Sequence, residues 1–208
     1  TSPGGANGAF GASVAGAGDV NSDRFPDVIV GAPGAQRAYV FAGTALGLSG
    51  AARVTFIDGT VARYGEVVGC AGDVDGDNHA DVFVAGAETA RRVELRRAGA
   101  AGNFAPAPIA LTVADTDLRF GRSVASADVN ADGFTDLLVA AAGVGFGSPR
   151  LFVYAGGATG LPTTATFAIP APGGVAGFAE GVASVGDVNR DGASDFVSAF
   201  FSPLVDES

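Results

Sequence analysis

A nine-residue acidic segment recurs four times in this chain, and its repetition constrains the fold more than any other feature. The copies read DVNSDRFPD (19–27), DVDGDNHAD (73–81), DVNADGFTD (128–136) and DVNRDGASD (187–195). Their first aspartates, Asp19, Asp73, Asp128 and Asp187, are 54, 55 and 59 residues apart. A period of this size indicates one supersecondary unit per copy, stacked against the next unit.

The first three units each have room for four short strands, and the fourth has room for two. The strands are predicted at 13–17, 27–31, 38–41 and 53–57 in the first unit, at 82–85, 92–96 and 109–113 in the second, at 137–140, 151–154 and 164–169 in the third, and at 179–185 and 195–200 in the fourth. They are apolar runs bounded by glycine-containing turns. The arginine-rich stretch 89–99 also reads as an amphipathic helix, but its alignment with 38–43 and 151–156 favours a strand with its arginines on a solvated face.

Four strands per unit is the make-up of a β-propeller blade, so the sequence predicts an all-β fold. The repeats span about 8–60, 62–116, 118–174 and 176–208, in a single propeller or propeller segment. Only two strands are predicted in the fourth repeat, which gives about three and a half to four blades. We therefore expect this chain to be part of a larger ring or to complete one, through further blades or as a homodimer, because open blade faces promote aggregation. The start at Thr1, without Met or a signal peptide, suggests a processed or trimmed product.

The spacing of oxygen-bearing side chains within each acidic segment predicts a calcium loop. Calcium takes six or more hard oxygen ligands, which alternate residues of a curled loop supply. Side chains at positions 1, 3, 5 and 9 and the backbone carbonyl at position 7 are the expected ligands. They are Asp19, Asn21, Asp23, Phe25 and Asp27; Asp73, Asp75, Asp77, His79 and Asp81; Asp128, Asn130, Asp132, Phe134 and Asp136; and Asp187, Asn189, Asp191, Ala193 and Asp195.

Position 6 of each loop is expected to need a positive φ angle. Gly133, Gly192 and Asn78 suit that conformation, whereas Arg24 fits it poorly. Up to four Ca²⁺ ions are therefore predicted, with the first loop the least favourable. A tight octahedral magnesium shell is a poorer match for loops so rich in protein oxygens.

The charge balance of the chain supports bound cations. The formal net charge is −10, and the loops hold 13 of the 22 acidic residues. Carboxylates crowded in one turn repel one another, so folding and calcium binding are expected to be coupled. The same charge disfavours nucleic acid as a partner. No apolar run is long enough for a membrane-spanning helix, so membrane insertion is not expected.

The repeats resemble the FG-GAP repeats of integrin α-subunits and their bacterial relatives. The motif is complete in the first repeat, as Phe10-Gly11 followed by Gly31-Ala32-Pro33, and partial in the others, which begin at Tyr64, Phe120 and Phe178. The resemblance implies a propeller, usually of seven blades, with the calcium loop between the first two strands of each blade. It also implies protein or carbohydrate partners, bound through the opposite face or the clefts between blades.

These features bear on three classes of function. The favoured one is a secreted or cell-surface module for protein or glycan recognition and adhesion, since loops of this kind in extracellular modules fill only at extracellular calcium levels. The alternative is a structural building block of an extracellular assembly or filament, closed by oligomerisation. Enzymatic activity is not expected: the only histidine, His79, lies in a metal loop, and Cys70 lies in a predicted inner strand, where a buried thiol is usual.

Overall fold

The computed structural model describes residues 5, 7–86, 91–113, 118–143, 148–174 and 177–199. The strands of this part are β1 (Ser13–Gly18), β2 (Asp27–Ala32), β3 (Arg37–Phe41), β4 (Val54–Ile57), β5 (Val67–Gly72), β6 (Asp81–Gly86), β7 (Arg92–Arg96), β8 (Ile109–Thr112), β9 (Leu118–Ala127), β10 (Asp136–Gly143), β11 (Arg150–Tyr154), β12 (Phe167–Pro170), β13 (Gly181–Gly186) and β14 (Asp195–Ala199). Three 3-10 turns, η1 (Pro33–Ala35), η2 (Ala100–Gly102) and η3 (Pro172–Gly174), are the only helical segments among these residues.

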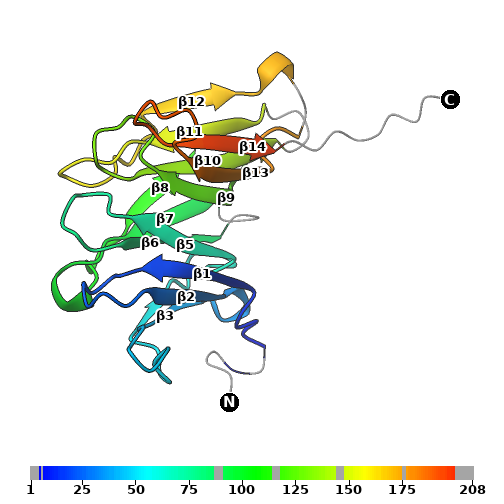
Figure 1. The fold of residues 1–208 in the computed structure, drawn as a ribbon. Helices are drawn as coiled ribbons and strands as arrows, with labels where there is room; N and C mark the ends of the chain where they lie inside the picture. The colour runs from blue at the N-terminus through cyan, green and yellow to red at the C-terminus, as the bar shows by residue number, and fades with distance from the viewer. Residues whose placement is uncertain are drawn as a thin grey trace.

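The strands form three four-stranded sheets and one two-stranded sheet, each an antiparallel meander in sequence order. We call them blade 1 (β1–β4), blade 2 (β5–β8), blade 3 (β9–β12) and blade 4 (β13–β14). Figure 1 shows blades 1, 2 and 3 stacked from bottom to top, with blade 4 overlapping blade 3 in this view. The first strands of successive blades are neighbours, because β1 contacts β5, β5 contacts β9 and β9 contacts β13. The predicted all-β fold of about three and a half propeller blades is confirmed.

The hydrophobic core is divided among the interfaces between blades. One cluster joins blades 1 and 2, a second joins blades 2 and 3, and a third joins blades 3 and 4. The valine at loop position 2 shows how each blade depends on the next. Val20 and Val74 are fully buried, whereas Val188 of blade 4 is 68% exposed. Blade 4 therefore presents a face that blades 1 and 2 bury against their successors.

The third repeat is one residue shorter before its acidic loop because it lacks the β-bulge that precedes the loop in the other blades. In blades 1, 2 and 4 the strand pairing shifts just before the acidic loop, at Gly18, Gly72 and Gly186. Each of these glycines has a φ of +70° to +74°, which a glycine adopts without steric cost. In blade 3, Ala127 pairs directly with Asp136 and no bulge precedes the loop. The loop itself keeps its geometry.

Two expectations are corrected by the structure. The last strand of blade 3 covers Phe167–Pro170 instead of 164–169, because the chain bends at residues 164 and 166 before it enters the strand. The strand at 92–96 is present, but its arginines do not form a solvated face. Arg96 is buried at 9% exposure and pairs with the fully buried Glu94, which also pairs with Arg92. The predicted end of the fourth repeat, 200–208, lies outside the described residues.

Candidate metal centres

The four acidic loops occupy equivalent places, each between the first and second strands of its blade. Their backbones follow the same path, since positions 4 and 6 have positive φ in every loop. Position 6 holds Arg24 (φ +74°), Asn78 (+64°), Gly133 (+88°) and Gly192 (+97°). The expected positive φ is therefore confirmed, and Arg24 adopts it although such a conformation is uncommon for a residue with a side chain.

Side chains at positions 1 and 5 close each loop by accepting hydrogen bonds from its backbone, and the asparagine at position 3 does the same in loops 1, 3 and 4. In loop 1 the Asp19 carboxylate accepts from the N–H groups of Asp23 (3.1 Å) and Arg24 (2.6 Å). Asn21 Oδ1 also accepts from Asp23, and Asp23 Oδ1 accepts from Phe25, both at 2.9 Å. The bonds from positions 1 and 5 recur in the other three loops. Oxygens at alternate positions are thus turned inward, as a calcium loop requires.

The aspartate at position 9 ties the loop to the third strand of its own blade. Asp27 accepts one hydrogen bond from Val20 N–H (2.9 Å) and another from Gly43 N–H (2.7 Å), just beyond β3. The equivalent pairs are Val74 (3.2 Å) and Ala98 (2.7 Å) at Asp81, and Val129 (2.9 Å) and Gly156 (2.8 Å) at Asp136. Asp195 accepts only from Val188 (3.0 Å) within the described part of the chain. Position 9 therefore has a structural role that does not depend on metal.

Burial of these position-9 aspartates makes their charge costly. Asp27, Asp81 and Asp136 are at most 1% exposed. Desolvation raises the pKa of Asp27 and of Asp136 above the ordinary value, and it raises the pKa of Asp81 to about 7, although backbone hydrogen bonds oppose the shift in each case. A divalent cation beside these carboxylates would favour their ionised form.

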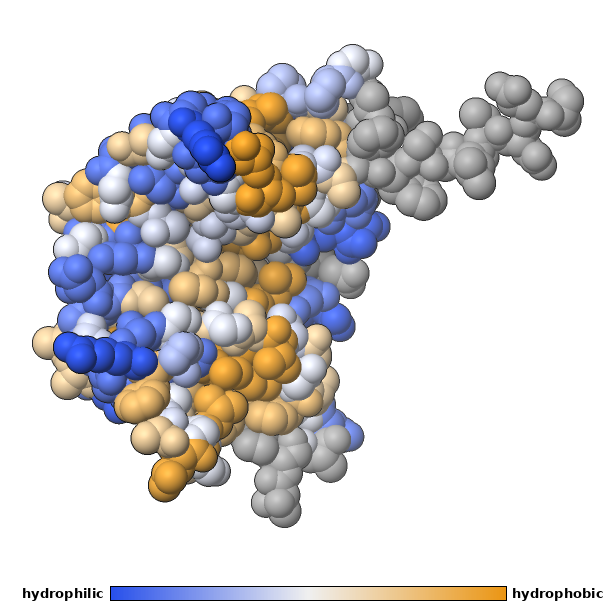
Figure 2. Space-filling model, in the orientation of Figure 1, coloured by the Kyte–Doolittle hydropathy of each residue, from blue (hydrophilic) through white to orange (hydrophobic). Residues whose placement is uncertain are grey.

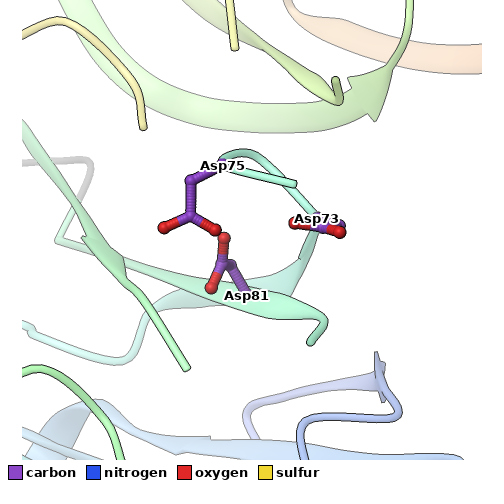
Figure 3. A group of neighbouring side chains, drawn as sticks. All are labelled: Asp73, Asp75 and Asp81. Carbon is purple, nitrogen blue, oxygen red and sulfur yellow. The ribbon is translucent and has the colours of Figure 1, made fainter. Parts of the chain in front are cut away.

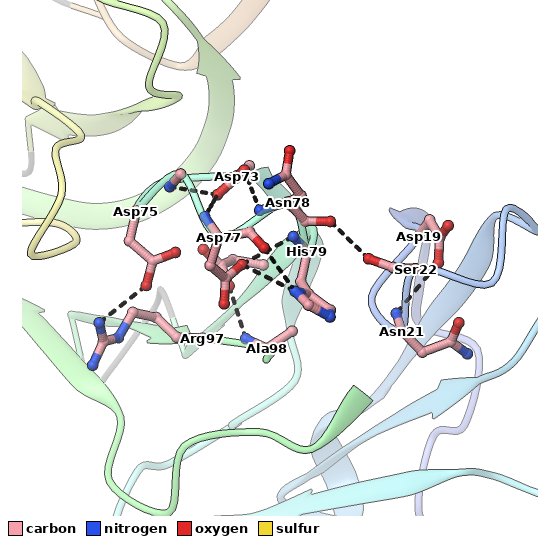
Figure 4. Close-up of polar contacts among 12 residues, drawn as sticks. Asp19, Asn21, Ser22, Asp73, Asp75, Asp77, Asn78, His79, Arg97 and Ala98 are labelled. Atoms are coloured by element: carbon pink, nitrogen blue, oxygen red, sulfur yellow. Dashed lines mark hydrogen bonds and ion pairs between the residues drawn. The ribbon is translucent and has the colours of Figure 1, made fainter. Parts of the chain in front are cut away.

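Loop 2 offers the best-formed ligand set. Oxygens of Asp73, Asp75 and Asp81 lie within 4.8 Å of one another, and Figure 3 shows the three carboxylates facing a common space. Asp75 Oδ1 is buried and accepts no hydrogen bond, whereas its Oδ2 pairs with Arg97 (Figure 4). A buried carboxylate oxygen without a partner is costly unless a ligand satisfies it. The residues present therefore fit a calcium ion, with Asp73, Asp75 and Asp81 as its expected holders.

The remaining predicted ligands do not belong to the group of three carboxylates in loop 2. Asp77 contacts His79, whose Nδ1 lies 3.1 Å from the Asp77 carbonyl oxygen. Phe134 packs on loop 2, where a Cβ at Gly76 would lie 2.8 Å from its ring. No three carboxylates of loops 1, 3 and 4 group as closely as those of loop 2 among the described residues. Their ligand sets, like that of loop 2, remain predictions.

Backbone hydrogen bonds join each loop to the next one. The position-1 carbonyl of one loop accepts from the position-8 N–H of its successor. The bonds are Ala80 N–H to Asp19 O (3.0 Å), Thr135 N–H to Asp73 O (3.0 Å) and Ser194 N–H to Asp128 O (2.7 Å). Ser22 Oγ adds a contact by donating to Asn78 O at 2.8 Å (Figure 4). The candidate metal sites are thus linked in a row across the blades.

Sequence reasoning missed Arg97 and the position-8 N–H groups. Every residue type except proline has a backbone N–H, so the sequence does not show which N–H groups donate. Pro26, at position 8 of loop 1, is the exception because it has no N–H. Arg97 could have been suspected from the sequence. Loop 2 alone carries an aspartate at position 3, and this additional carboxylate favours a nearby cation.

The fold and the loops define the chain as a propeller-type repeat protein. Residues 73–139 and 128–198 match the FG-GAP-like repeat family, and residues 10–46 match the FG-GAP repeat. The chain therefore belongs to the FG-GAP-like repeat family, as its resemblance to that family predicted. No curated protein matches the chain.

Family membership indicates a binding module of the propeller type, since FG-GAP repeat proteins are generally non-enzymatic. Burial raises the pKa of Cys70 above the ordinary thiol value, which keeps this side chain protonated at neutral pH. No helix among the described residues is long and apolar enough to cross a membrane.

Proposed function

We propose that this chain is a non-catalytic, calcium-stabilised binding module of the cell surface or the extracellular space. Asp75 Oδ1 carries the calcium part of the proposal, because it is buried, lacks a hydrogen bond and belongs to a group of three converging carboxylates. The other three loops share the backbone path of loop 2, so up to four ions are proposed.

Calcium affinity supports the proposed location. Loops of this type in extracellular modules bind calcium with Kd of roughly 10⁻⁴–10⁻³ M. Extracellular calcium fills such sites, whereas the cytosolic concentration leaves them empty. A fold that depends on these ions therefore belongs outside the cytosol.

A cleft between blades 2 and 3 supports recognition of a protein or carbohydrate ligand. The cleft has a volume of about 320 Å³ and is lined by Thr112, Arg150, Phe152 and Tyr154 among others. The Tyr154 hydroxyl is buried without a hydrogen-bond partner at this cleft. Aromatic faces together with hydroxyl groups and a guanidinium suit a sugar ring or a protein side chain.

Calcium removal tests the first part of the proposal. We expect a chelator to lower the melting temperature by tens of degrees, because three or four carboxylates are then left to repel one another in each loop. Differential scanning calorimetry with calcium and with EDTA measures the change. Asp75→Ala is expected to abolish one site only and to lower the stoichiometry from isothermal titration by one. An unchanged melting curve in EDTA would contradict calcium stabilisation.

Glycan and cell-surface protein arrays test recognition. We expect calcium-loaded protein to bind a defined subset of glycans or proteins and Phe152→Ala to weaken that binding, with the fully exposed Leu46→Ala on blade 1 as the matched control. Silence across the arrays together with ordered self-association would instead favour a structural building block of an extracellular assembly.

Blade 4 supports a role within a larger ring. Val185, Val188 and Val197 are 43%, 68% and 54% exposed, and Figure 2 shows hydrophobic side chains gathered over β13 and β14. The counterparts of Val197 in blades 1 to 3, Ile29, Phe83 and Leu138, are at most 3% exposed. We therefore propose that a further blade or a second copy of the chain covers this face.

A further inference from the structure

Loop 2 has an arginine paired with the carboxylate at its position 3. Arg97 Nη1 lies 3.1 Å from Asp75 Oδ2, and the side chains of Arg97 and Asp75 are 36% and 12% exposed. Arg97 is the first residue after β7. Figure 4 shows its guanidinium approaching Asp75 from the side opposite to the turn of the loop.

The equivalent positions in blades 1 and 3 provide an internal comparison. Ala42 follows β3 and Ala155 follows β11, so neither blade has a cation at this place. Their loops carry Asn21 and Asn130 at position 3, where loop 2 carries Asp75. An extra carboxylate and an extra guanidinium thus occur in the same blade. With four aspartates and Arg97, loop 2 has a formal charge of −3, equal to that of loop 3, which has three aspartates and no arginine.

The two oxygens of the Asp75 carboxylate have different surroundings. Its Oδ2 contacts Arg97, while its Oδ1 is buried without a hydrogen bond and Asp75 belongs to the group formed with Asp73 and Asp81. The ion pair is compatible with metal binding, because one oxygen remains free for the ion. Arg97 would therefore affect calcium binding in two ways, by holding the Asp75 side chain and by the repulsion between its own positive charge and the ion.

The neighbouring blade leaves room for the Arg97 side chain. Gly160, in the turn between β11 and β12, has a φ of +83°. A Cβ at this position would lie 3.2 Å from Arg97 Cδ and 3.4 Å from Nη1. A side chain at 160 would crowd Arg97 by a few tenths of an ångström and would be strained at this φ, so glycine suits the position.

We propose that Arg97 is a counter-ion that sets the calcium affinity of loop 2. It offsets the fourth carboxylate, stabilises the loop without metal and lowers calcium affinity to the level of the three-carboxylate loops. This inference rests on the proposed calcium binding. Calcium affinity in such loops depends on the number of charged groups. Removal of one cation is therefore expected to lower the calcium Kd of loop 2 by about three- to tenfold.

His79 provides a reporter for loop 2 alone, because it is the only histidine of the chain and occupies position 7 of this loop. Its ring protons give one set of NMR signals that can be followed during a calcium titration of the full chain. We expect the midpoint to fall three- to tenfold in Arg97→Ala and to stay near wild type in Arg97→Lys, which keeps the charge. In Arg97→Ala combined with Asp75→Asn, which copies the pattern of loops 1 and 3, the midpoint is expected to return to the wild-type range.

Arg122→Ala is the matched control, since Arg122 is a similarly exposed arginine that pairs with Glu180 away from any acidic loop. We expect it to leave the His79 midpoint unchanged. If His79 signals of the wild type ignore calcium, the proposed metal site fails. If they respond but Arg97→Ala binds calcium equally or more weakly, the metal site stands and the counter-ion role is overturned.

Discussion

At the scale of single residues, the aspartates at position 9 are expected to link the proposed metal binding to protonation. Each accepts two backbone hydrogen bonds in blades 1 to 3 and is almost fully buried. Burial raises the pKa of Asp81 to about 7, above the value of the unfolded chain near 4. Between these two values the folded, metal-free protein binds more protons than the unfolded chain, so its stability falls as the pH rises.

The contribution of these aspartates to the stability of the metal-free protein is therefore expected to be complete below pH 4. It is expected to be lost as the pH rises through about 7. We expect the melting temperature in EDTA to be roughly 5 °C or more higher at pH 5.5 than at pH 8. With saturating calcium the trend is expected to reverse, because protons compete with the ion for the same carboxylates. Calorimetry at several pH values measures both trends. A metal-free protein that grows more stable toward pH 8 would contradict this assignment.

At the scale of elements, the loops act as connectors between blades. Each interface has a hydrogen bond from a position-8 N–H to a position-1 carbonyl, at 2.7–3.0 Å. Loop 1 shows that a proline fits the backbone at position 8, since Pro26 occupies it. The same residue type can therefore be used in another loop to remove one N–H while the loop path is kept.

Thr135→Pro removes the bond between loop 3 and the Asp73 carbonyl of loop 2. We expect it to lower the free energy of unfolding by about 1–3 kcal/mol relative to Thr135→Ala, because the carbonyl loses its partner at the interface. Urea denaturation in calcium measures the difference, and Thr135→Ala keeps the N–H while removing the side chain. Equal stability of the two variants would show that the bond contributes nothing.

Elements of this kind were only partly predictable from the sequence. Strands followed from apolar runs, and the loops from aspartates at fixed spacing, because both depend on local residue types. The bulge at Gly18 and its absence at Ala127 appeared only as a one-residue slip. The pairing of Glu94 with Arg92 and Arg96 was missed, because a run of arginines does not reveal that the preceding blade covers it, where Arg96 lies over the Phe56 ring.

At the scale of the whole molecule, the two ends of the stack are open but poorly matched to each other. Blade 4 exposes Val188, and blade 1 exposes Val14 at 61%. Two of the hydrogen bonds between blades 1 and 2 run from Ala80 N–H to Asp19 O and from Val68 N–H to Ser13 Oγ. A junction of blade 4 with blade 1 of a second copy would lack both, since Pro26 has no N–H and Gly181 stands where blade 1 has Ser13.

Self-association through these faces is therefore expected to be weak, reversible and dependent on concentration, because burial of apolar surface drives it without the two hydrogen bonds. Sedimentation velocity in calcium over a range of concentrations measures it. Val188→Lys is expected to shift the protein toward monomer without lowering its melting temperature, because the side chain is exposed within one copy. Leu46→Lys, at a fully exposed residue of the β3–β4 connection, is the matched control and is expected to leave association unchanged. A tight dimer that Val188→Lys does not weaken would place the contact elsewhere, and the open face of blade 4 would then be left for a further blade alone.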